Sequence, residues 1–120
     1  MAGFNETLRR VALKVPESQV LMVMGTDGIP IEKLVIRADP NMEAVAAEYT
    51  SLLRASLSAA ADTGLGSLQE LSIQTERMTA LLVSITPEYF LFAALDPGAV
   101  VGRARFALKM ADVALEKEFA

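Results

Sequence analysis

The spacing of three strand-like segments in the second half of the chain is the feature that most constrains the fold. The segments span residues 68–75 (LQELSIQT), 79–86 (TALLVSIT) and 89–95 (YFLFAAL), and at most three residues separate neighbouring segments. A crossover between parallel strands needs a dozen or more residues, whereas a hairpin needs only a few. The three segments are therefore predicted to form an antiparallel meander.

The first half of the chain contains a second strand pair. Residues 19–25 (QVLMVMG) and 31–37 (IEKLVIR) are predicted strands that flank Gly-Thr-Asp-Gly at positions 25–28. This tetrapeptide lacks the alternating Asp and Asn ligands of a calcium loop and the lysine of a phosphate loop. Glycine permits positive φ, and aspartate bonds to its own backbone, so we interpret the segment as a hairpin turn rather than a ligand site.

Helical periodicity of the apolar residues predicts three helices, over residues 4–15, 39–64 and 96–120. Asp39 or Asn41 is the expected cap of the second helix, and Asp96 is the expected cap of the third. The expected buried stripes are Met42, Val45, Tyr49, Leu52, Leu53 and Leu57 in the second helix, and Val100, Val101, Ala104, Leu108, Ala111 and Leu115 in the third.

The composition of the strands predicts their order in the sheet. The strands at 20–24, 80–85 and 90–95 are apolar at nearly every position, so both of their faces are expected to be covered and they belong in the middle. The strands at 31–37 and 68–75 are mixed, which is typical of edges. With hairpins joining neighbours, the predicted fold is α+β: a five-stranded antiparallel sheet in the order 2-1-5-4-3, in a profilin-like sandwich. One long helix is expected on one face and the two terminal helices on the other.

Two surfaces of this predicted fold are unusual. The edge strand at 68–75 has neither Pro nor Lys, the residues that commonly protect an open edge. The long helix carries small residues on its outer face, which serve either for close approach of another backbone or only for helix propensity. Antiparallel pairing of two copies through the edge strand would also bring the long helices together. The predicted dimer interface comprises Leu68, Glu70, Leu71, Ser72, Ile73 and Gln74 with Ala44, Ala47, Ser51 and Ala55.

Composition excludes several kinds of function. The chain has 120 residues and no Cys or His, so thiolate and imidazole metal sites are impossible and the commonest general base is missing. A net charge of −4 argues against a nucleic-acid partner. The longest apolar run is far below the ~20 residues needed to cross a bilayer, and no signal peptide is recognised. We expect a single cytoplasmic domain over residues 1–120, with no membrane insertion, catalytic residues, metal or cofactor.

Two long segments resemble the roadblock family, the dynein light chain roadblock type. LRRVALKVPESQVLMVMGTDGIPIEKL resembles the first helix, first strand and first hairpin of that family. LGSLQELSIQTERMTALLVSITPEYFLFAALDPGAVVGRARFAL resembles its meander and the start of its last helix, where Arg105 aligns with a frequent arginine and Arg103 is left unassigned. The similarity runs from about Leu8 to Leu115 and is strongest to the short prokaryotic form, similar to the gliding regulator MglB.

The resemblance implies a homodimer with one sheet running across the two-fold axis. It also implies a non-catalytic regulator or scaffold of a small Ras-like GTPase. The partner surface is expected on the long helix, at Glu48, Ser51, Arg54, Ala55 and Ser58. Solvation is the favoured interpretation of the Arg54 side chain, and also of a basic cluster formed by Arg103, Arg105 and Lys109. The alternatives are a profilin-like sensor that binds a small ligand and a light-chain scaffold without a GTPase partner.

Overall fold

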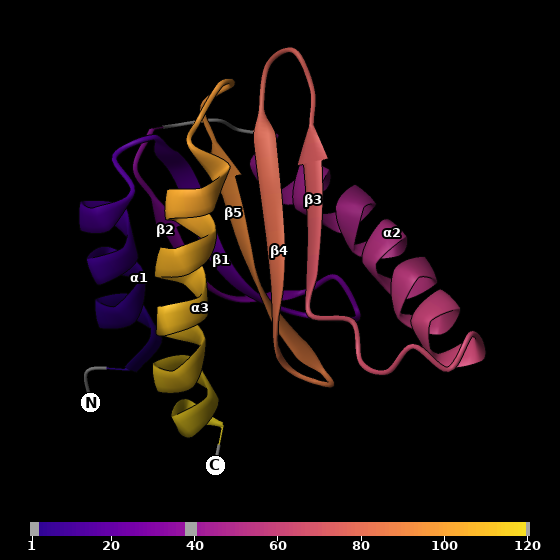
Figure 1. Ribbon diagram of the computed structural model, residues 1–120. Helices are drawn as coiled ribbons and strands as arrows, with labels where there is room; N and C mark the ends of the chain where they lie inside the picture. The colour runs from indigo at the N-terminus through magenta and orange to yellow at the C-terminus, as the bar shows by residue number, and fades with distance from the viewer. Residues whose placement is uncertain (1–2, 38–40, 120) are drawn as a thin grey trace.

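The computed structural model describes residues 3–37 and 41–119. Five strands form one antiparallel sheet in the order β2-β1-β5-β4-β3, as predicted. Three helices flank this sheet (Figure 1). The elements are α1 (Gly3–Lys14), β1 (Ser18–Gly25), β2 (Pro30–Val35), α2 (Met42–Asp62), β3 (Glu70–Gln74), β4 (Thr79–Thr86), β5 (Tyr89–Leu95) and α3 (Val101–Glu118).

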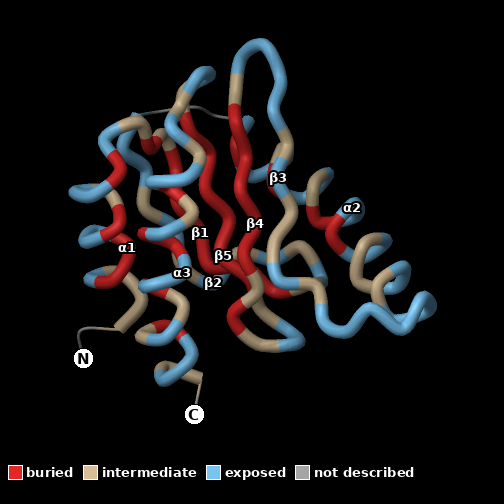
Figure 2. Tube along the Cα trace, viewed as in Figure 1, coloured by how far each residue is buried: buried red, intermediate tan, exposed pale blue. Residues whose placement is uncertain are grey.

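The sheet is packed between two helical layers, and this arrangement is also the predicted one. Helices α1 and α3 lie side by side over one face, while α2 lies behind the other (Figure 1). Alternate residues of β4 enter the two cores: Leu81 and Val83 pack with α1 and α3, whereas Leu82 packs with α2. Strands β1, β5 and β4 are therefore buried almost throughout, while β2 and β3 are more exposed (Figure 2).

The Gly25–Gly28 segment forms a hairpin turn, in agreement with the sequence interpretation. The Gly28 N–H donates to the Gly25 carbonyl at 2.9 Å, and Gly28 has a φ of +90°, which favours glycine. The Asp27 carboxylate accepts a hydrogen bond from the Ile29 N–H at 3.0 Å. The aspartate thus stabilises the turn that joins β1 to β2.

The structure corrects the predicted length of the third strand. The expected strand covered residues 68–75, but β3 contains only Glu70–Gln74. Leu68 and Gln69 still contact β4, since their carbonyls accept hydrogen bonds from the Ser84 hydroxyl and the Ser84 N–H. The chain before them leads away toward the end of α2, so Leu68 lies outside the strand itself.

The helices also differ in detail from the expectations. Asp39 lies outside the described residues, and Asn41 occupies the N-cap position of α2. Asp96 is not the cap of the last helix, because α3 begins only at Val101 and the Asp96 carboxylate instead accepts hydrogen bonds from Gln19 and Arg37.

Two residues of the expected buried stripes are exposed. Val100 precedes α3 and is 56% exposed, while Leu52 of α2 is 49% exposed. Thr50 is buried instead, although the pattern of large apolar residues did not predict this. Its burial is tolerated because its hydroxyl donates a hydrogen bond to the Ala46 carbonyl at 2.7 Å.

Candidate interaction surfaces

The open edge of β3 presents the backbone groups of three residues. Gln69 accepts from the Ser84 N–H and the Thr75 N–H donates to Met78, so the backbone groups of these two residues point toward β4. Hydrogen-bonding direction alternates along an antiparallel strand. The N–H and C=O groups of Glu70, Ser72 and Gln74 consequently point away from the sheet.

The side chains of β3 belong to both layers. Leu71 and Ile73 are half-buried and pack against the core beneath α2. Glu70 lies on the opposite face, where its two carboxylate oxygens accept from the Arg105 Nε at 2.8 and 2.7 Å. Lys109 Nζ is 3.9 Å from the same carboxylate. The edge strand is thus anchored to α3 as well as to α2.

These contacts correct the expectation of a solvated basic cluster on the last helix. Arg105 and Lys109 pair with Glu70, and Arg103 pairs with Glu17. The side chain of Glu70 is only 16% exposed, so its charge requires a partner. Sequence separation concealed the pairing, because Glu70 and Arg105 are 35 positions apart.

The outer face of α2 carries exposed small residues, with Arg54 beside them. Ala44, Ala47, Ser51, Ala55 and Ser58 are exposed or nearly so, as is Glu48. Arg54 is not simply solvated, because its Nη1 donates to the Thr26 carbonyl at 2.7 Å and its Nη2 donates to Ser51 Oγ at 3.3 Å. Arg54 therefore joins α2 to the β1–β2 turn.

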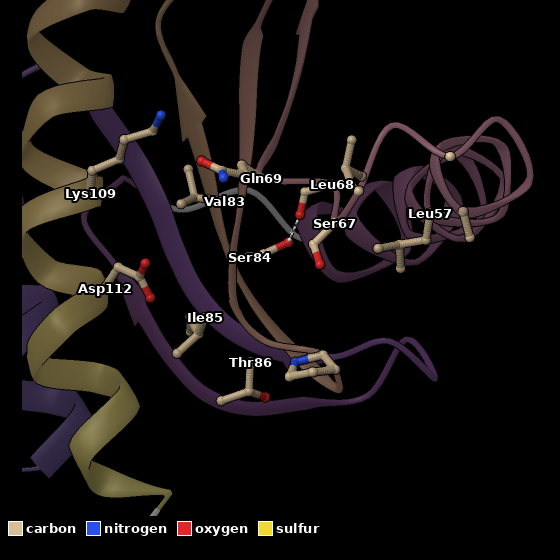
Figure 3. A pocket seen from close by; sticks show the side chains of 14 residues that line it. Leu57, Ser67, Leu68, Gln69, Val83, Ser84, Ile85, Thr86, Lys109 and Asp112 are labelled. Atoms are coloured by element: carbon tan, nitrogen blue, oxygen red, sulfur yellow. Dashed lines mark hydrogen bonds between the residues drawn. The ribbon is translucent and has the colours of Figure 1, made fainter.

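A groove of about 870 Å³ opens before the first residue of β3, Glu70, along the longer strand β4. Ile85, Thr86 and Pro87 form its floor beyond the last contact with β3. Lys109 and Asp112 of α3 border one side, and Ser67 and Leu68 border the other (Figure 3). The groove was not predicted from the sequence, because it is formed by a difference in length between two neighbouring strands.

Asp112 is the most unusual polar group of the groove. Burial raises the pKa of its carboxyl, the nearby charge of Glu116 raises it further, and Lys109 acts in the opposite direction. Its Oδ1 atom is buried and has no hydrogen-bond partner among the described residues. The lack of a partner for this buried oxygen disfavours the charged form of Asp112, and the residue presents its carboxyl group along one side of the groove.

The described residues, 3–37 and 41–119, contain no group of three Asp or Glu side chains placed to hold a metal ion. None of the helices within these ranges is long and apolar enough to cross a membrane.

The chain is similar to one protein family and to several solved structures. The family model described as the Roadblock/LC7 domain matches residues 4–95, a region that ends before α3. The structure of MglC from Myxococcus xanthus is 27% identical, with a TM-score of 0.67, over 96% of this chain and 98% of that chain. No curated protein sequence matches the chain.

Two further solved structures share the fold at lower identity. The gliding protein MglB from Thermus thermophilus is 19% identical, with a TM-score of 0.83, over 95% of this chain and 86% of that chain. Profilin II from Acanthamoeba castellanii is 14% identical, with a TM-score of 0.53, over 92% of this chain and 96% of that chain. The latter agrees with the predicted profilin-like sandwich.

Proposed function

The chain belongs to the Roadblock/LC7 family, and from this premise we propose that it is a cytoplasmic homodimeric module that binds and regulates a small Ras-like GTPase. The observation that carries the proposal is the open edge of β3 beside the exposed small-residue face of α2. Solved relatives named MglB and MglC support a role in regulation or scaffolding. The module acts by binding and not by chemistry of its own.

Dimerisation is proposed to occur through β3, with the small residues of α2 lying against the same helix of the second copy. Glu70, Leu71, Ser72, Ile73 and Gln74 form the strand seam, with Leu68 at its margin. Ala44, Ala47, Ser51 and Ala55 form the helical contact. The exposed backbone groups of Glu70, Ser72 and Gln74 favour this arrangement, since pairing would satisfy them without further change in the chain.

The GTPase is proposed to bind the outer face of α2 next to the dimer contact, at Glu48, Ser51, Arg54, Ala55 and Ser58, where Ser51 and Ala55 are shared with the helical contact and Glu48, Arg54 and Ser58 extend beyond it. Small side chains permit close approach of a partner helix or switch segment. Arg54 contributes here by fixing α2 to the β1–β2 turn, since its guanidinium already donates to Thr26 and Ser51. We therefore expect regulation by reshaping the GTPase rather than by an inserted arginine.

The proposal is tested by capture from the lysate of the source organism, once with GDP and once with a non-hydrolysable GTP analogue. Nucleotide-dependent enrichment of a small GTPase supports a regulator, and its purified form then enters hydrolysis assays. Nucleotide-independent enrichment favours a scaffold. If no GTPase is enriched with either nucleotide, the GTPase assignment is wrong.

A pair of matched variants locates the partner surface. Ser58→Arg places a bulky charge on the exposed face of α2, and Val113→Arg places the same charge on the exposed face of α3. We expect Ser58→Arg to abolish capture of the GTPase while Val113→Arg retains it. The native mass of both variants shows whether loss of capture reflects loss of the dimer instead.

The groove beside the beginning of β3 favours a second candidate function, binding of a small ligand. It combines apolar residues such as Ile85 and Leu68 with the polar groups of Ser84, Lys109 and Asp112. It lies beside the beginning of β3, and residues of α2, α3 and β4 line it. A thermal-shift screen against nucleotides and metabolites tests this function, for which a saturable shift with one compound is the expected result.

A further inference from the structure

The groove follows the part of β4 that is not covered by β3, next to the first residue of β3. Residue levels across the two strands are fixed by their register, in which Glu70 lies opposite Val83. Leu68 is therefore level with Ile85, which lies beside Asp112 in the groove (Figure 3). Any segment that continues the sheet past β3 at this level passes the mouth of the groove.

The outward backbone groups of β3 select one register for a second copy. If Ser72 lies opposite Ser72 of the second copy, Glu70 lies opposite Gln74 and all three outward residues are paired. A shift that places two Glu70 residues opposite each other brings like charges together, which destabilises a strand pair. A shift in the other direction places Ser72 opposite the β3–β4 turn of the second copy instead of opposite its β3 strand. The symmetric register about Ser72 is therefore favoured.

This register brings the β3–β4 hairpin of the second copy to the groove. Counting outward from Ser72, Glu76 and Arg77 of that copy are level with Leu68 and Ser67. Both hairpin residues are exposed. Asp112 and Lys109 in the groove carry the opposite charges. The Asp112 carboxylate lines the groove as an anion that the Arg77 guanidinium would approach, although its Oδ1 atom is itself buried.

We propose that the groove of each protomer receives the hairpin tip of a second copy, with Arg77 directed toward Asp112. This inference rests on the proposed dimer through β3 and adds a reciprocal contact outside the strand seam. Each dimer then contains two such contacts, one at either end of the paired strands. The contact fixes the register and closes the groove to other ligands.

A cross-linking experiment tests the contact, since the chain has no cysteine of its own. The double variant Arg77→Cys/Asp112→Cys is treated with a short bismaleimide and resolved on a denaturing gel. Within one chain the two sites lie about eight strand residues apart, or roughly 25 Å, so the linker joins only different copies. The two Arg77 positions of a dimer are separated by roughly 30 Å in the proposed register and do not cross-link to each other.

The matched control is Arg77→Cys/Val113→Cys, in which the second thiol lies on the next residue of α3 but on its exposed face. We expect a covalent dimer from the Asp112 variant at several times the yield of the control. Ser72→Cys alone reports the seam, since its two thiols meet at the two-fold axis.

The outcomes separate the two levels of the proposal. A native dimer that cross-links through Ser72→Cys but not through Arg77→Cys/Asp112→Cys overturns the groove contact and leaves the dimer standing. A monomeric native mass at every concentration overturns both. In a third measurement, Arg77→Glu is expected to lower the affinity of the dimer about fivefold. Adding Asp112→Arg to that variant is expected to restore the affinity. Unchanged affinity in Arg77→Glu also contradicts the contact.

Discussion

The two edges of the sheet are protected to different degrees. Strand β2 begins at Pro30, its register with β1 shifts between Val23 and Met24, and Lys33 pairs with Glu43 of α2 at 2.9 Å. The Lys33 N–H accordingly bonds the Glu32 carboxylate at 3.2 Å instead of a neighbouring strand. Strand β3 has no proline, no lysine and no register shift with β4, and its outward backbone groups belong to Glu70, Ser72 and Gln74. The difference indicates that β3, and not β2, is the edge available for pairing.

The largest effect on stability is expected from a proline at a position of β3 whose N–H points toward β4. The Ile73 N–H points toward β4, so Ile73→Pro removes a hydrogen bond within the sheet and leaves a β4 carbonyl unsatisfied. We expect the free energy of unfolding to fall by about 3 kcal/mol. Urea unfolding followed by circular dichroism measures the change. A variant as stable as the wild type would contradict the assignment of inward and outward residues.

The next effect separates dimerisation from folding. The Ser72 N–H points outward, so Ser72→Pro preserves the β3–β4 ladder and removes only the groups that a second copy would use. We expect a folded monomer, with the dimer weakened on the order of 100-fold. Val35→Pro is the matched control on β2, since Ile36 bonds Gln19 and the Val35 N–H therefore also points outward. Light scattering after gel filtration should find Val35→Pro dimeric; equal loss in both variants would remove the distinction between the edges.

The sheet order could be predicted from the sequence because strand composition reports burial directly. Strands β4 and β5 are apolar on both faces, and this pattern is local. The ion pair between Glu70 and Arg105 and the bond from Arg54 to Thr26 could not be predicted, because both join residues far apart in the chain. The small-residue face of α2 was visible as a periodic pattern, but its role as an interface stays a prediction. The prediction for Asp96 was wrong because an acidic residue before a helix has the same signature whether it caps the helix or binds a neighbouring strand.

A smaller effect is expected from the ion pairs that hold β3 to α3. Arg105 bonds both oxygens of Glu70, whereas Arg103 is an exposed arginine of the same helix that bonds Glu17 outside the edge strand. Arg105→Gln is expected to lower the free energy of unfolding by about 1 kcal/mol, since the pair is partly exposed. It should also weaken the dimer, because β3 loses its anchor. Arg103→Gln should have no effect on dimer mass, and a larger loss of dimer from Arg103→Gln would contradict this role of Arg105.

The smallest expected effect is on the pH dependence of stability, and it differs in sign between Asp96 and Asp112. Hydrogen bonds from Gln19 and then Arg37 lower the pKa of Asp96, whereas burial raises that of Asp112. Asp96 thus binds its proton less readily in the folded state. Its contribution is present above its unfolded pKa of about 3.9 and is lost as the pH falls through the lower folded value. For Asp112 the sign is opposite, and a cost develops as the pH rises from about 3.9 through the raised folded value.

Asp96→Asn should therefore lower the free energy of unfolding at pH 7 by roughly half a kcal/mol or less, because the pair with Arg37 is partly exposed to solvent. The effect should be smaller at pH 3. Asp112→Asn should raise the midpoint at pH 7 in the monomeric Ser72→Pro background, where only Lys109 offsets the burial of the charge. In the dimeric protein the same substitution should lower it, because the proposed hydrogen bond from Arg77 then loses its charged acceptor. Unfolding curves at fixed protein concentration measure both. The same sign for Asp112→Asn in monomer and dimer would show that nothing from a second copy reaches Asp112, and would make the edges differ only in their backbone.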